Sequence, residues 1–312
     1  MIQVFHSVGA ARTALGGCVV TIGKYDGMHL GHQKILDELK AEAKRLGVPA
    51  LVILSEPQPE EFFAGDAAPV RLNAFHDKVR FLDEFGIDAV YCLGFDRATS
   101  LQSPAAFISE VLLQGLGMRS VVVGEDFRFG HNRSGNIATL QQMGQQARFD
   151  VRPVAPCAES GERISSTLIR QCLQHGDCAR AAACLGRPYS ISGIVVKGRQ
   201  LGRQLGYPTA NLQLQSNRLP LFGIFAVEVL YNDTILHGVA SVGFNPTVSD
   251  GTQASLEVYL LDFDADIYDS TLTVSFLHKL RDEAKFDSLA LLKTQIDTDV
   301  QDAQTWFRNR KQ

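Results

Sequence analysis

The sequence predicts two domains: an α/β domain with a parallel sheet, then a β-barrel domain followed by one terminal helix. Three observations lead to this prediction. The chain has 312 residues, and a single domain usually has about 100–200. Apolar runs alternate with helical patterns in the first half, whereas strand patterns follow one another directly in the second half. The pattern changes near Gly186, Arg187 and Pro188, so we expect domains at residues 1–186 and 187–312.

The first half has the pattern of a parallel sheet with helices on both faces. Short apolar runs, typical of buried strands, lie at residues 18–23, 50–54, 89–93 and 121–123. Helical patterns lie at residues 32–46, 74–85 and 104–116. Continuous apolar strands separated by amphipathic helices are typical of parallel sheets. Because such sheets bind ligands beyond the carboxyl ends of their strands, we expect the chemistry there.

The second half has the pattern of an antiparallel barrel. Strand-like segments lie at residues 189–197, 224–231, 235–242, 256–262 and 272–277. Gly, Asn, Asp and Pro turns join them without intervening helices, which favours a barrel. One amphipathic helix, at residues 288–307, comes last.

Composition and charge exclude several classes of protein. Hydrophobic residues make up 45% of the chain and charged residues 21%, which is ordinary for a globular protein and excludes a disordered, collagen-like or coiled-coil chain. The net charge of −4 disfavours general nucleic-acid binding, which needs clustered Lys and Arg. No apolar run reaches the about 18–20 residues of a membrane span. We therefore expect no nucleic-acid partner and no membrane partner.

The cysteines and the first residues indicate a cytoplasmic protein. Residues 1–20 lack a basic flank, an apolar core and a small-residue cleavage site. The six cysteines form no C-x-x-C pair, so a zinc ribbon or a thioredoxin-type site has no support. Cys172, Cys178 and Cys184 fall in a helical stretch and are expected to be packing residues. We expect all six thiols to be reduced.

The segment at residues 23–32 carries two histidines between a strand and a helix. His29 and His32 are three residues apart, so they face the same side of a first helical turn. Free backbone N–H groups and the helix dipole attract phosphate there, and Gly27 and Gly31 let the backbone approach a ligand. Two imidazoles at this place can stabilise negative charge on a phosphorus centre. The alternative is a pair of surface histidines in a glycine-rich loop, which the strand–H-x-G-H–helix context disfavours.

A second segment, at residues 163–170, has the sequence RISSTLIR. One hydroxyl is enough to cap a helix, whereas three consecutive hydroxyls with Arg170 one turn later suit a triphosphate. Together, H-x-G-H and I-S-S-T-x-x-R resemble the signature pair of the nucleotidyltransferase superfamily that transfers AMP from ATP. The Walker A and dinucleotide G-x-G-x-x-G patterns are absent from the sequence, which disfavours a P-loop kinase or a dehydrogenase.

In the second half, residues 198–211 form a segment rich in Gly and Arg after the first barrel strand. Backbone N–H and guanidinium groups of such a segment bind phosphates. Thr209 and Asn211 offer oxygen atoms to Mg²⁺, which prefers oxygen ligands. The alternative is a flexible basic loop. Glu257 lies on a later strand, on the face opposite to its apolar neighbours, and is either a solvated glutamate or a general base at a barrel mouth.

Nearly the whole chain resembles the bifunctional riboflavin kinase/FAD synthetase family of prokaryotes. The most specific parts of the resemblance are residues 29–32, 124–130, 165–170, 208–211 and 276–286. The resemblance implies a Rossmann-like nucleotidyltransferase domain and a riboflavin kinase barrel. It also implies two ATP-dependent steps: the barrel domain converts riboflavin to FMN, and the other domain, an FMN adenylyltransferase, converts FMN to FAD and releases pyrophosphate.

The resemblance also implies roles for individual residues. In the adenylyltransferase domain, the implied ATP-binding residues are Gly23, Asp26, Gly31, Ser165, Ser166 and Thr167, and the catalytic residues are His29, His32 and Arg170. The implied flavin-binding residues of that domain are Pro57, Phe62, Asp126, Phe127 and Arg128. In the kinase domain, the implied residues are Gly198, Gly202, Gly206, Pro208 and Asn245 for ATP, Arg281, Glu283 and Phe286 for flavin, Thr209 and Asn211 for Mg²⁺, and Glu257 as the catalytic base.

Some positions differ from the usual pattern of the family. Lys24 stands where Asn is more frequent, Tyr25 where Phe is common, and Ser55 where an aromatic residue is frequent. These differences concern substrate affinity and rate more than the type of reaction. Two alternatives stay open: only one domain is active, or the chain is a non-catalytic protein that senses flavin nucleotides or binds RNA.

Overall fold

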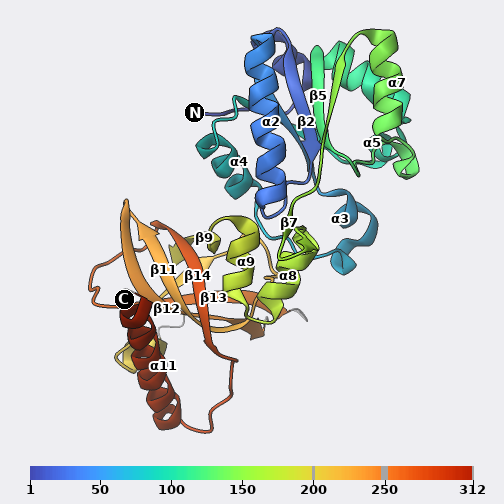
Figure 1. Ribbon diagram of the computed structural model, residues 1–312. Helices are drawn as coiled ribbons and strands as arrows, with labels where there is room; N and C mark the ends of the chain where they lie inside the picture. Colours follow the sequence, from blue (N-terminus) through green and yellow to red (C-terminus); the bar gives the residue numbers. More distant parts are fainter. Residues whose placement is uncertain (199–200, 247–251, 311–312) are drawn as a thin grey trace. The chain divides into compact units, whose positions relative to one another are not determined.

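A six-stranded sheet and a closed six-stranded barrel form the cores of two units of the chain (Figure 1). The structure is a computed structural model that describes residues 1–198, 201–246 and 252–310. The first unit contains residues 1–69 and 75–165, and the second unit contains residues 70–74 and 166–312. None of the helices in the described ranges is both long enough and apolar enough to cross a membrane.

All strands of the sheet in the first unit are parallel, as predicted, and their order is β1-β4-β3-β2-β5-β6. These strands are β1 (Gln3–Phe5), β2 (Cys18–Gly23), β3 (Ala50–Glu56), β4 (Ala89–Gly94), β5 (Met118–Gly124) and β6 (Asp150–Val154). The sequence did not predict β1 and β6. Both are edge strands, and most of their side chains are exposed, so they lack the continuous apolar pattern of a buried strand.

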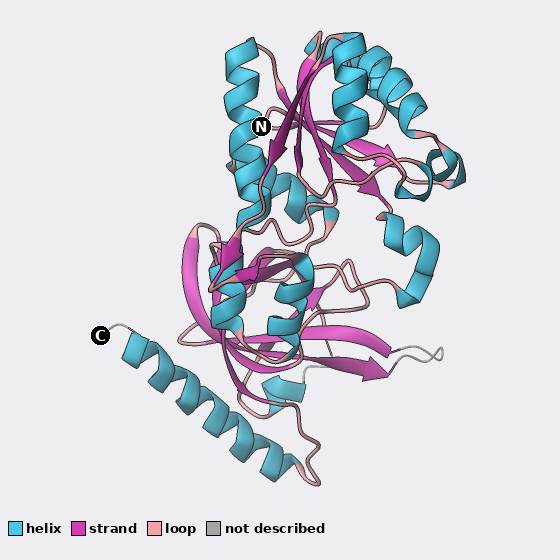
Figure 2. Cartoon of the chain, turned by 45° about the vertical axis from the view of Figure 1, so that its right-hand side comes forward, coloured by secondary structure: helices cyan, strands magenta, loops and turns pink. Residues whose placement is uncertain are grey.

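Helices cover both faces of this sheet (Figure 2). The helical elements of the first unit are α1 (Val8–Leu15), α2 (Leu30–Leu46), α3 (Pro59–Ala64), η1 (Gly65–Ala67), α4 (Phe75–Glu84), α5 (Arg97–Leu101), α6 (Pro104–Ala106), η2 (Phe107–Gly115), η3 (His131–Arg133) and α7 (Ile137–Ala147). The predicted helix at residues 104–116 is present as α6 and the π-helix η2. A short hairpin of β7 (Ala158–Glu159) and β8 (Glu162–Arg163) follows the sheet.

Successive side chains of the central strands alternate between two apolar layers. Val19 of β2 packs with α2 and α4 on one face, whereas Val20 packs with α1, η2 and α7 on the other. Both valines are fully buried. Burial on both faces explains why each central strand is a continuous apolar run rather than an alternating one.

The strand order reverses direction at β2. From β2 the chain moves to β3 and then β4 on one side, whereas β5 pairs with the other side of β2. In parallel sheets the loops that follow two such strands diverge and leave a crevice at their carboxyl ends. The loop after β2 contains His29, and the loop after β5 contains Asp126. The topology therefore brings two of the predicted segments to one edge of the sheet.

The second unit is built on the predicted antiparallel barrel, in which the strand order is β10-β13-β12-β11-β14-β9. Its strands are β9 (Tyr189–Val196), β10 (Thr209–Gln213), β11 (Gly223–Tyr231), β12 (Thr234–Pro246), β13 (Thr252–Leu260) and β14 (Thr271–Arg281). Its helices are α8 (Ser166–Gln174), α9 (Cys178–Leu185), α10 (Leu201–Gln204) and the predicted terminal helix, α11 (Leu289–Arg310).

The division between the units lies earlier in the chain than the predicted domain boundary at Gly186. Helices α8 and α9 pack against each other, and α9 also contacts β9 and β14. Cys172, Cys178 and Cys184 are buried in these two helices, as predicted for packing residues. Because both helices belong to the packing of the barrel unit, the compact division falls after Ser165. Whether residues 1–186 behave as one functional domain stays a prediction.

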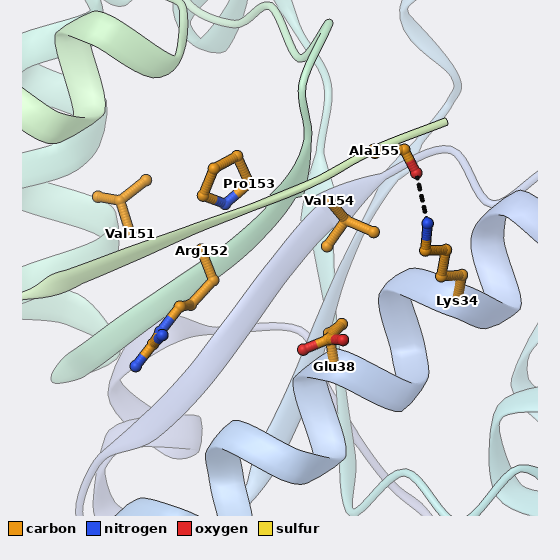
Figure 3. A pocket seen from close by; sticks show the side chains of 7 residues that line it. All are labelled: Lys34, Glu38, Val151, Arg152, Pro153, Val154 and Ala155. Atoms are coloured by element: carbon orange, nitrogen blue, oxygen red, sulfur yellow. Dashed lines mark hydrogen bonds between the residues drawn. The ribbon is translucent and has the colours of Figure 1, made fainter. Parts of the chain in front are cut away.

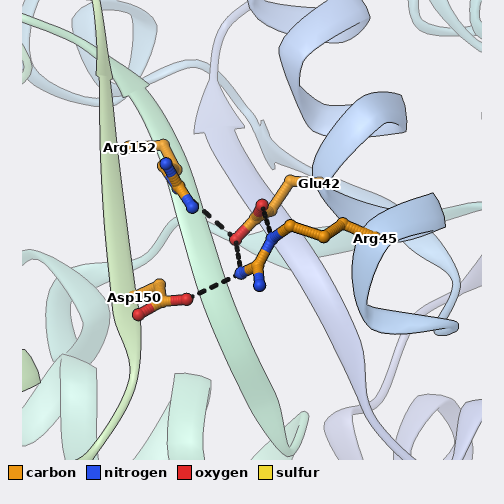
Figure 4. A network of polar contacts seen from close by, with 4 residues as sticks. All are labelled: Glu42, Arg45, Asp150 and Arg152. Atoms are coloured by element: carbon orange, nitrogen blue, oxygen red, sulfur yellow. Dashed lines mark hydrogen bonds and ion pairs between the residues drawn. The ribbon is translucent and has the colours of Figure 1, made fainter.

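A network of charged side chains joins α2 to the edge strand β6 (Figure 4). Arg45 donates two hydrogen bonds of 2.7 Å to the buried carboxylate of Glu42 and one of 2.8 Å to Asp150. The Nε atom of Arg152 lies 3.5 Å from Glu42. The hydrogen bonds from Arg45 lower the pKa of Glu42 to about 2, against the opposing effect of burial.

A surface pocket of about 350 Å³ lies beside this network, between α2 and β6 (Figure 3). Lys34 and Glu38 of α2 line it together with residues 151–155, and Nζ of Lys34 donates a 3.2 Å hydrogen bond to the carbonyl oxygen of Ala155. No residue that the sequence predicts for a site lines this pocket.

The Glu42 network predicts a pH-dependent loss of stability. Glu42→Gln should lower the free energy of unfolding at pH 7 by about 1–3 kcal/mol, because it removes hydrogen bonds to a charged group. Since the folded pKa lies below the ordinary value of 4.5, this stabilisation is present above about pH 4.5 and is lost as the pH falls towards 2. Urea unfolding at several pH values measures it. Glu38→Gln, on an exposed carboxylate of the same helix, is the matched control, and equal effects of both substitutions would contradict the prediction.

Candidate functional sites

The loop between β2 and α2 places His29 and His32 together. His29 is the N-cap of α2, and its Nδ1 atom accepts a hydrogen bond of 3.3 Å from the backbone N–H of His32. The two imidazole rings are stacked, with centroids 3.7 Å apart. Because Nδ1 of His29 accepts, a neutral ring carries its proton on Nε2. His29 is thereby prepared to donate one hydrogen bond from Nε2.

The surroundings of the two histidines keep both rings neutral. Burial lowers the pKa of His29 to about 4, and the charge of Arg163 adds to this effect. The pKa of His32 is also lowered well below its ordinary value, first by burial and then by the nearby His29, Lys78 and Lys24. Without a bound anion, these residues are hydrogen-bonding groups rather than cations.

The glycines and Tyr25 shape this loop from within. Gly27 has a φ of +89°, which side chains disfavour. A Cβ atom on Gly31 would lie 3.1 Å from Nδ1 of His29, so the glycine makes room for the imidazole. Tyr25 is 1% exposed, and its hydroxyl lies 2.7 Å from Oγ1 of Thr21. Its ring centroid is 4.8 Å from that of His32, so Tyr25 supports the histidine from the core.

Two further predicted residues of this loop have different surroundings. Gly23 ends β2, and a Cβ atom there would lie 2.9 Å from the ring of Tyr25. Asp26 is 1% exposed. Both residues are therefore part of the packing that fixes the loop, and their predicted contacts with ATP stay predictions.

The loop after β5 contributes a carboxylate and an aromatic stack. Asp126 accepts a hydrogen bond of 2.5 Å from Arg163 of β8. Burial favours the neutral form of Asp126, but the hydrogen bond and charge of Arg163 outweigh it and lower the pKa. Phe127 stacks on the buried Phe129 with centroids 5.4 Å apart, so its ring is partly engaged with the core, while Arg128 is exposed.

An exposed aromatic cluster follows β3. The rings of Phe62, Phe63 and Phe95 lie 5.2–5.9 Å apart in edge-to-face pairs. Phe63 is 69% exposed and Phe62 is 39% exposed. Lys24 makes an ion pair of 2.6 Å with Glu60 of α3, so the residue that differs from the family's pattern fastens the histidine loop to the helix that carries Phe62.

Pro57, the remaining predicted flavin contact of the first unit, follows a cis peptide bond after Glu56. It comes directly after β3, next to the start of α3. The structure therefore places it on the segment that leads into the aromatic cluster.

The predicted phosphate segment RISSTLIR spans the division between the two units. Ser165 is the last residue of the first unit, whereas Ser166, Thr167 and Arg170 lie on α8 of the second. Within the second unit, Nε of Arg170 donates a 2.5 Å hydrogen bond to the carbonyl oxygen of Val70. The predicted roles of these four residues in ATP binding and catalysis stay predictions.

The second unit brings Thr209, Asn211 and Glu257 together on adjacent strands. Asn211 of β10 is paired with Glu257 of β13 in the antiparallel register. Oγ1 of Thr209 donates a 3.2 Å hydrogen bond to Oε2 of Glu257. Leu256 and Val258 are buried, whereas Glu257 is half-buried, so it lies on the opposite face of β13, as predicted. The arrangement gathers one carboxylate, one hydroxyl and one amide.

Helix α10 and the first residues of strand β10 lie inside the predicted Gly/Arg segment, residues 198–211. The strand has only two buried apolar residues, Ala210 and Leu212, which is too short a pattern to recognise in the sequence. A Cβ atom on Gly198 would lie 2.4 Å from the side chain of Asn211, so this glycine allows a close approach. Gly202 is similarly close to the backbone of Tyr207.

The other predicted ATP-binding residues of the barrel have few or no described neighbours. Gly206 has a φ of +89° and faces open space, and Pro208 is exposed. The side chain of Asn245, on β12, lies outside the described part of the structure. The same is true of Gln200, which the sequence places in the Gly/Arg segment.

The predicted flavin residues of the barrel lie around Gly243 and α11. A Cβ atom on Gly243 would lie 2.0 Å from Oε1 of Glu283, and burial raises the pKa of Glu283 against the charge of Arg281. The guanidinium of Arg281 lies 5.8 Å from the ring centroid of Phe286 and forms two 2.7 Å hydrogen bonds with Asp299. Among the described residues, no hydrogen bond or ion pair connects this group to Glu257.

Sequence reasoning missed several residues of these sites. Arg163 lies within the RISSTLIR segment, but its pairing with Asp126 is set by the β7–β8 hairpin and has no local signal. Phe95 lies directly after β4, and no local signal in the sequence joins it to Phe62 and Phe63. Asp299, the partner of Arg281, lies on a helix whose sequence shows only an ordinary polar face.

Comparisons with known proteins match each half of the chain to a family model. Residues 11–168 match the family model of FAD synthetase, and residues 185–307 match that of riboflavin kinase. Curated relatives that carry the name bifunctional riboflavin kinase/FMN adenylyltransferase match almost the full chain. The relative from Escherichia coli K12 is 44% identical over 98% of this chain and 97% of its own, and the relative from Pseudomonas fluorescens is 45% identical over 96% of each.

A solved structure has the same fold over nearly the whole chain. It is described as a macrolide-efflux protein from Streptococcus pneumoniae, is 29% identical, and has a TM-score of 0.84 over 98% of this chain and all of that one. Its description differs from the names of the curated relatives, and the likeness supports the fold.

The neutral state of His29 is directly measurable. We expect NMR of the imidazole to give a titration midpoint of about 4, because burial and Arg163 disfavour the charged ring. An unfolded histidine binds its proton near pH 6.5, so folding should also lose stability as the pH falls from about 6.5 towards 4. His29→Asn assigns the resonance. A titration midpoint near 6.5 in the protein without ligand would show that the ring of His29 is solvated. The buried environment described for His29 would then be wrong.

Proposed function

Because the chain belongs to the family of bifunctional riboflavin kinases/FMN adenylyltransferases, we propose that the two groups of residues described above perform its two reactions. The chain phosphorylates riboflavin to FMN with ATP, and it adenylylates FMN with a second ATP to FAD and pyrophosphate. The main support for this assignment is that each unit has its own polar group: the stacked histidines in the first, and Thr209, Asn211 and Glu257 in the second.

In the adenylylation step, an oxygen of the FMN phosphate attacks the α-phosphorus of ATP, and the bond to pyrophosphate breaks. A phosphate monoester has a second pKa of about 6 and is largely anionic at neutral pH, so it needs no general base. We propose that Nε2–H of His29 donates a hydrogen bond to the α-phosphate. Such a preorganised donor at a buried site stabilises charge as it develops. His32 supports the ring of His29 by stacking.

The surroundings of the histidine loop suit the other parts of the two substrates. The free N–H groups at the start of α2 can bind phosphate oxygens, and Arg163 supplies positive charge near His29. The exposed rings of Phe62 and Phe63, with the half-buried ring of Phe95 beside them, offer an apolar surface for the planar flavin. Ser165, Ser166, Thr167 and Arg170 stay the proposed contacts of the ATP phosphates.

In the kinase step, the 5′-hydroxyl of riboflavin attacks the γ-phosphorus of ATP, and ADP leaves. An alcohol is a weak nucleophile, so a positioned base is useful. We assign this role to the carboxylate of Glu257, which removes the hydroxyl proton. The hydrogen bond from Thr209 holds the carboxylate in one orientation.

The donor set beside Glu257 fits Mg²⁺. Thr209 and Asn211 supply uncharged oxygen atoms next to a carboxylate, and Mg²⁺ prefers hard oxygen ligands and usually takes only one or two from the protein besides phosphate and water. We propose that Thr209 and Asn211 hold this ion. When bound, it neutralises charge on the ATP phosphates. We also propose that the enzyme works in the cytoplasm, which is supported by six cysteines that form no disulfide with one another.

One assay tests the proposed function as a whole. The full chain is incubated with riboflavin, ATP and Mg²⁺, and the flavins are separated by chromatography. We expect both FMN and FAD. Formation of FMN without FAD would mean that only the kinase reaction takes place. Unchanged riboflavin would contradict the kinase assignment. A parallel incubation with FMN in place of riboflavin tests the adenylylation step alone.

Single substitutions test which residues serve which reaction. Glu257→Gln should reduce riboflavin phosphorylation by about 10²–10⁴-fold, because it removes the general base, and should leave FMN adenylylation intact. His29→Asn should do the reverse, with a loss of about 10²–10³-fold in adenylylation. Steady-state rates with each substrate measure both effects, and circular dichroism checks folding. If folded Glu257→Gln protein lost adenylylation as well, the assignment of one reaction to each group would fail.

A further inference from the structure

Helix α11 is firmly attached to the barrel along its second half. Ala303 and Phe307 are buried in an apolar cluster with Ile224 of β11 and Val239 of β12. The ring of Phe307 also stacks on that of His237 with centroids 3.9 Å apart. These contacts fix the position of the helix independently of the polar residues near its middle.

The first half of α11 carries two carboxylates with separate partners. Asp299 is 4% exposed and receives two 2.7 Å hydrogen bonds from Arg281 and one of 3.0 Å from Gln295. Arg281 is the last residue of β14 and begins the segment proposed to bind the flavin. A buried carboxylate that pairs with both ends of a guanidinium fixes the direction of that side chain.

Asp297 has its partner in the proposed nucleotide segment. It accepts a hydrogen bond from the hydroxyl of Tyr207, which raises the pKa of Tyr207 to about 12. Tyr207 lies between Gly206 and Pro208, just before Thr209, and its ring meets Tyr259 of β13 edge to face at 5.1 Å. Lys293 lies 3.2 Å from the same carboxylate.

The side chains of Asp297 and Asp299 point in different directions from the helix axis. Residues two apart on an α-helix are separated by about 200° around its axis. Asp297 and Asp299 therefore reach two different segments of the chain, as their partners confirm. A helix that is fixed to the barrel along its second half can in this way hold both substrate-binding segments from its middle.

We propose that Asp297 and Asp299 are positioning residues for the kinase reaction. Asp297 holds Tyr207, which lies among the predicted ATP contacts Gly206, Pro208 and Thr209. Asp299 holds Arg281, the first of the predicted flavin contacts. This inference rests on the proposed function of the barrel. Neither carboxylate touches the reacting atoms. Each determines how well one substrate is bound, so their loss affects different Michaelis constants.

The experiment compares Tyr207→Phe, Asp297→Ala and Asp299→Asn in the full chain. Tyr207→Phe and Asp297→Ala should each raise the KM for ATP in FMN formation about five- to tenfold, because a hydrogen bond to a charged group is lost. The double variant should show no larger effect than either alone. Asp299→Asn should raise the KM for riboflavin by a similar factor and leave the KM for ATP unchanged.

Matched controls separate positioning from general stability. Asp302→Asn makes the same charge change on an exposed residue of the same helix and should leave both constants unchanged. Asp299→Glu should recover part of the riboflavin affinity, because it restores the charge. Adenylylation of added FMN should be normal in every variant. Thermal unfolding is recorded for each, and Tyr207→Phe, which keeps the ring, carries the test if Asp299→Asn does not fold.

Two results would overturn the inference. Variants that unfold at lower temperature but keep both Michaelis constants would show that the carboxylates only fasten the helix. Equal increases of both constants in every variant would show a general distortion of the barrel. A wild-type chain that forms no FMN is a distinct outcome, because it would overturn the proposed kinase function and this inference with it.

Discussion

The reversal of strand order at β2 is the constraint on which the histidine site depends. Because β3 and β5 pair with opposite sides of β2, the loops after β2 and β5 leave the sheet in different directions at the same edge. That edge also receives the free N–H groups at the start of α2. His29 caps this helix, so the fold itself orients the imidazole. Burial then keeps the ring neutral and leaves one N–H for a ligand.

In the barrel, strand pairing rather than a helix cap positions the functional side chains. Antiparallel pairing of β10 and β13 sets Thr209, Asn211 and Glu257 side by side, and the absence of a side chain at Gly198 gives the amide room. A carboxylate suits proton removal from an alcohol, whereas neutral donors suit an anionic nucleophile. The two groups therefore differ in the way expected if each of them serves the reaction proposed for it.

The sequence predicted the architecture well because its signals are local. Buried strands such as β2 and β3 are continuous apolar runs, and α2 ends at Gly47 in the left-handed conformation typical of a helix stop. Edge strands and β10 have no such pattern and were missed. The position of the compact division was also not predictable, because it depends on how α8 and α9 pack against the barrel.

The sequence also pointed to His29 and His32 through the H-x-G-H motif, and to Glu257 through strand alternation and the resemblance to the family. It could not give their environment. The neutral state of the histidines follows from burial and from nearby charges, those of Arg163 for His29 and of Lys78 and Lys24 for His32, which only the folded chain brings near. The ion pair of Lys24 with Glu60 and the contacts of Asp297 and Asp299 join segments far apart in the sequence. Such pairings depend on tertiary structure and have no periodic signal.

On this account, two separate groups of residues bind ATP in one chain. Hydrogen–deuterium exchange with and without a non-hydrolysable ATP analogue and Mg²⁺ tests it most directly. Two binding sites predict slower exchange of backbone amides at residues 26–32 and, independently, at residues 202–211. Protection confined to one of these segments, or to neither, would contradict the claim.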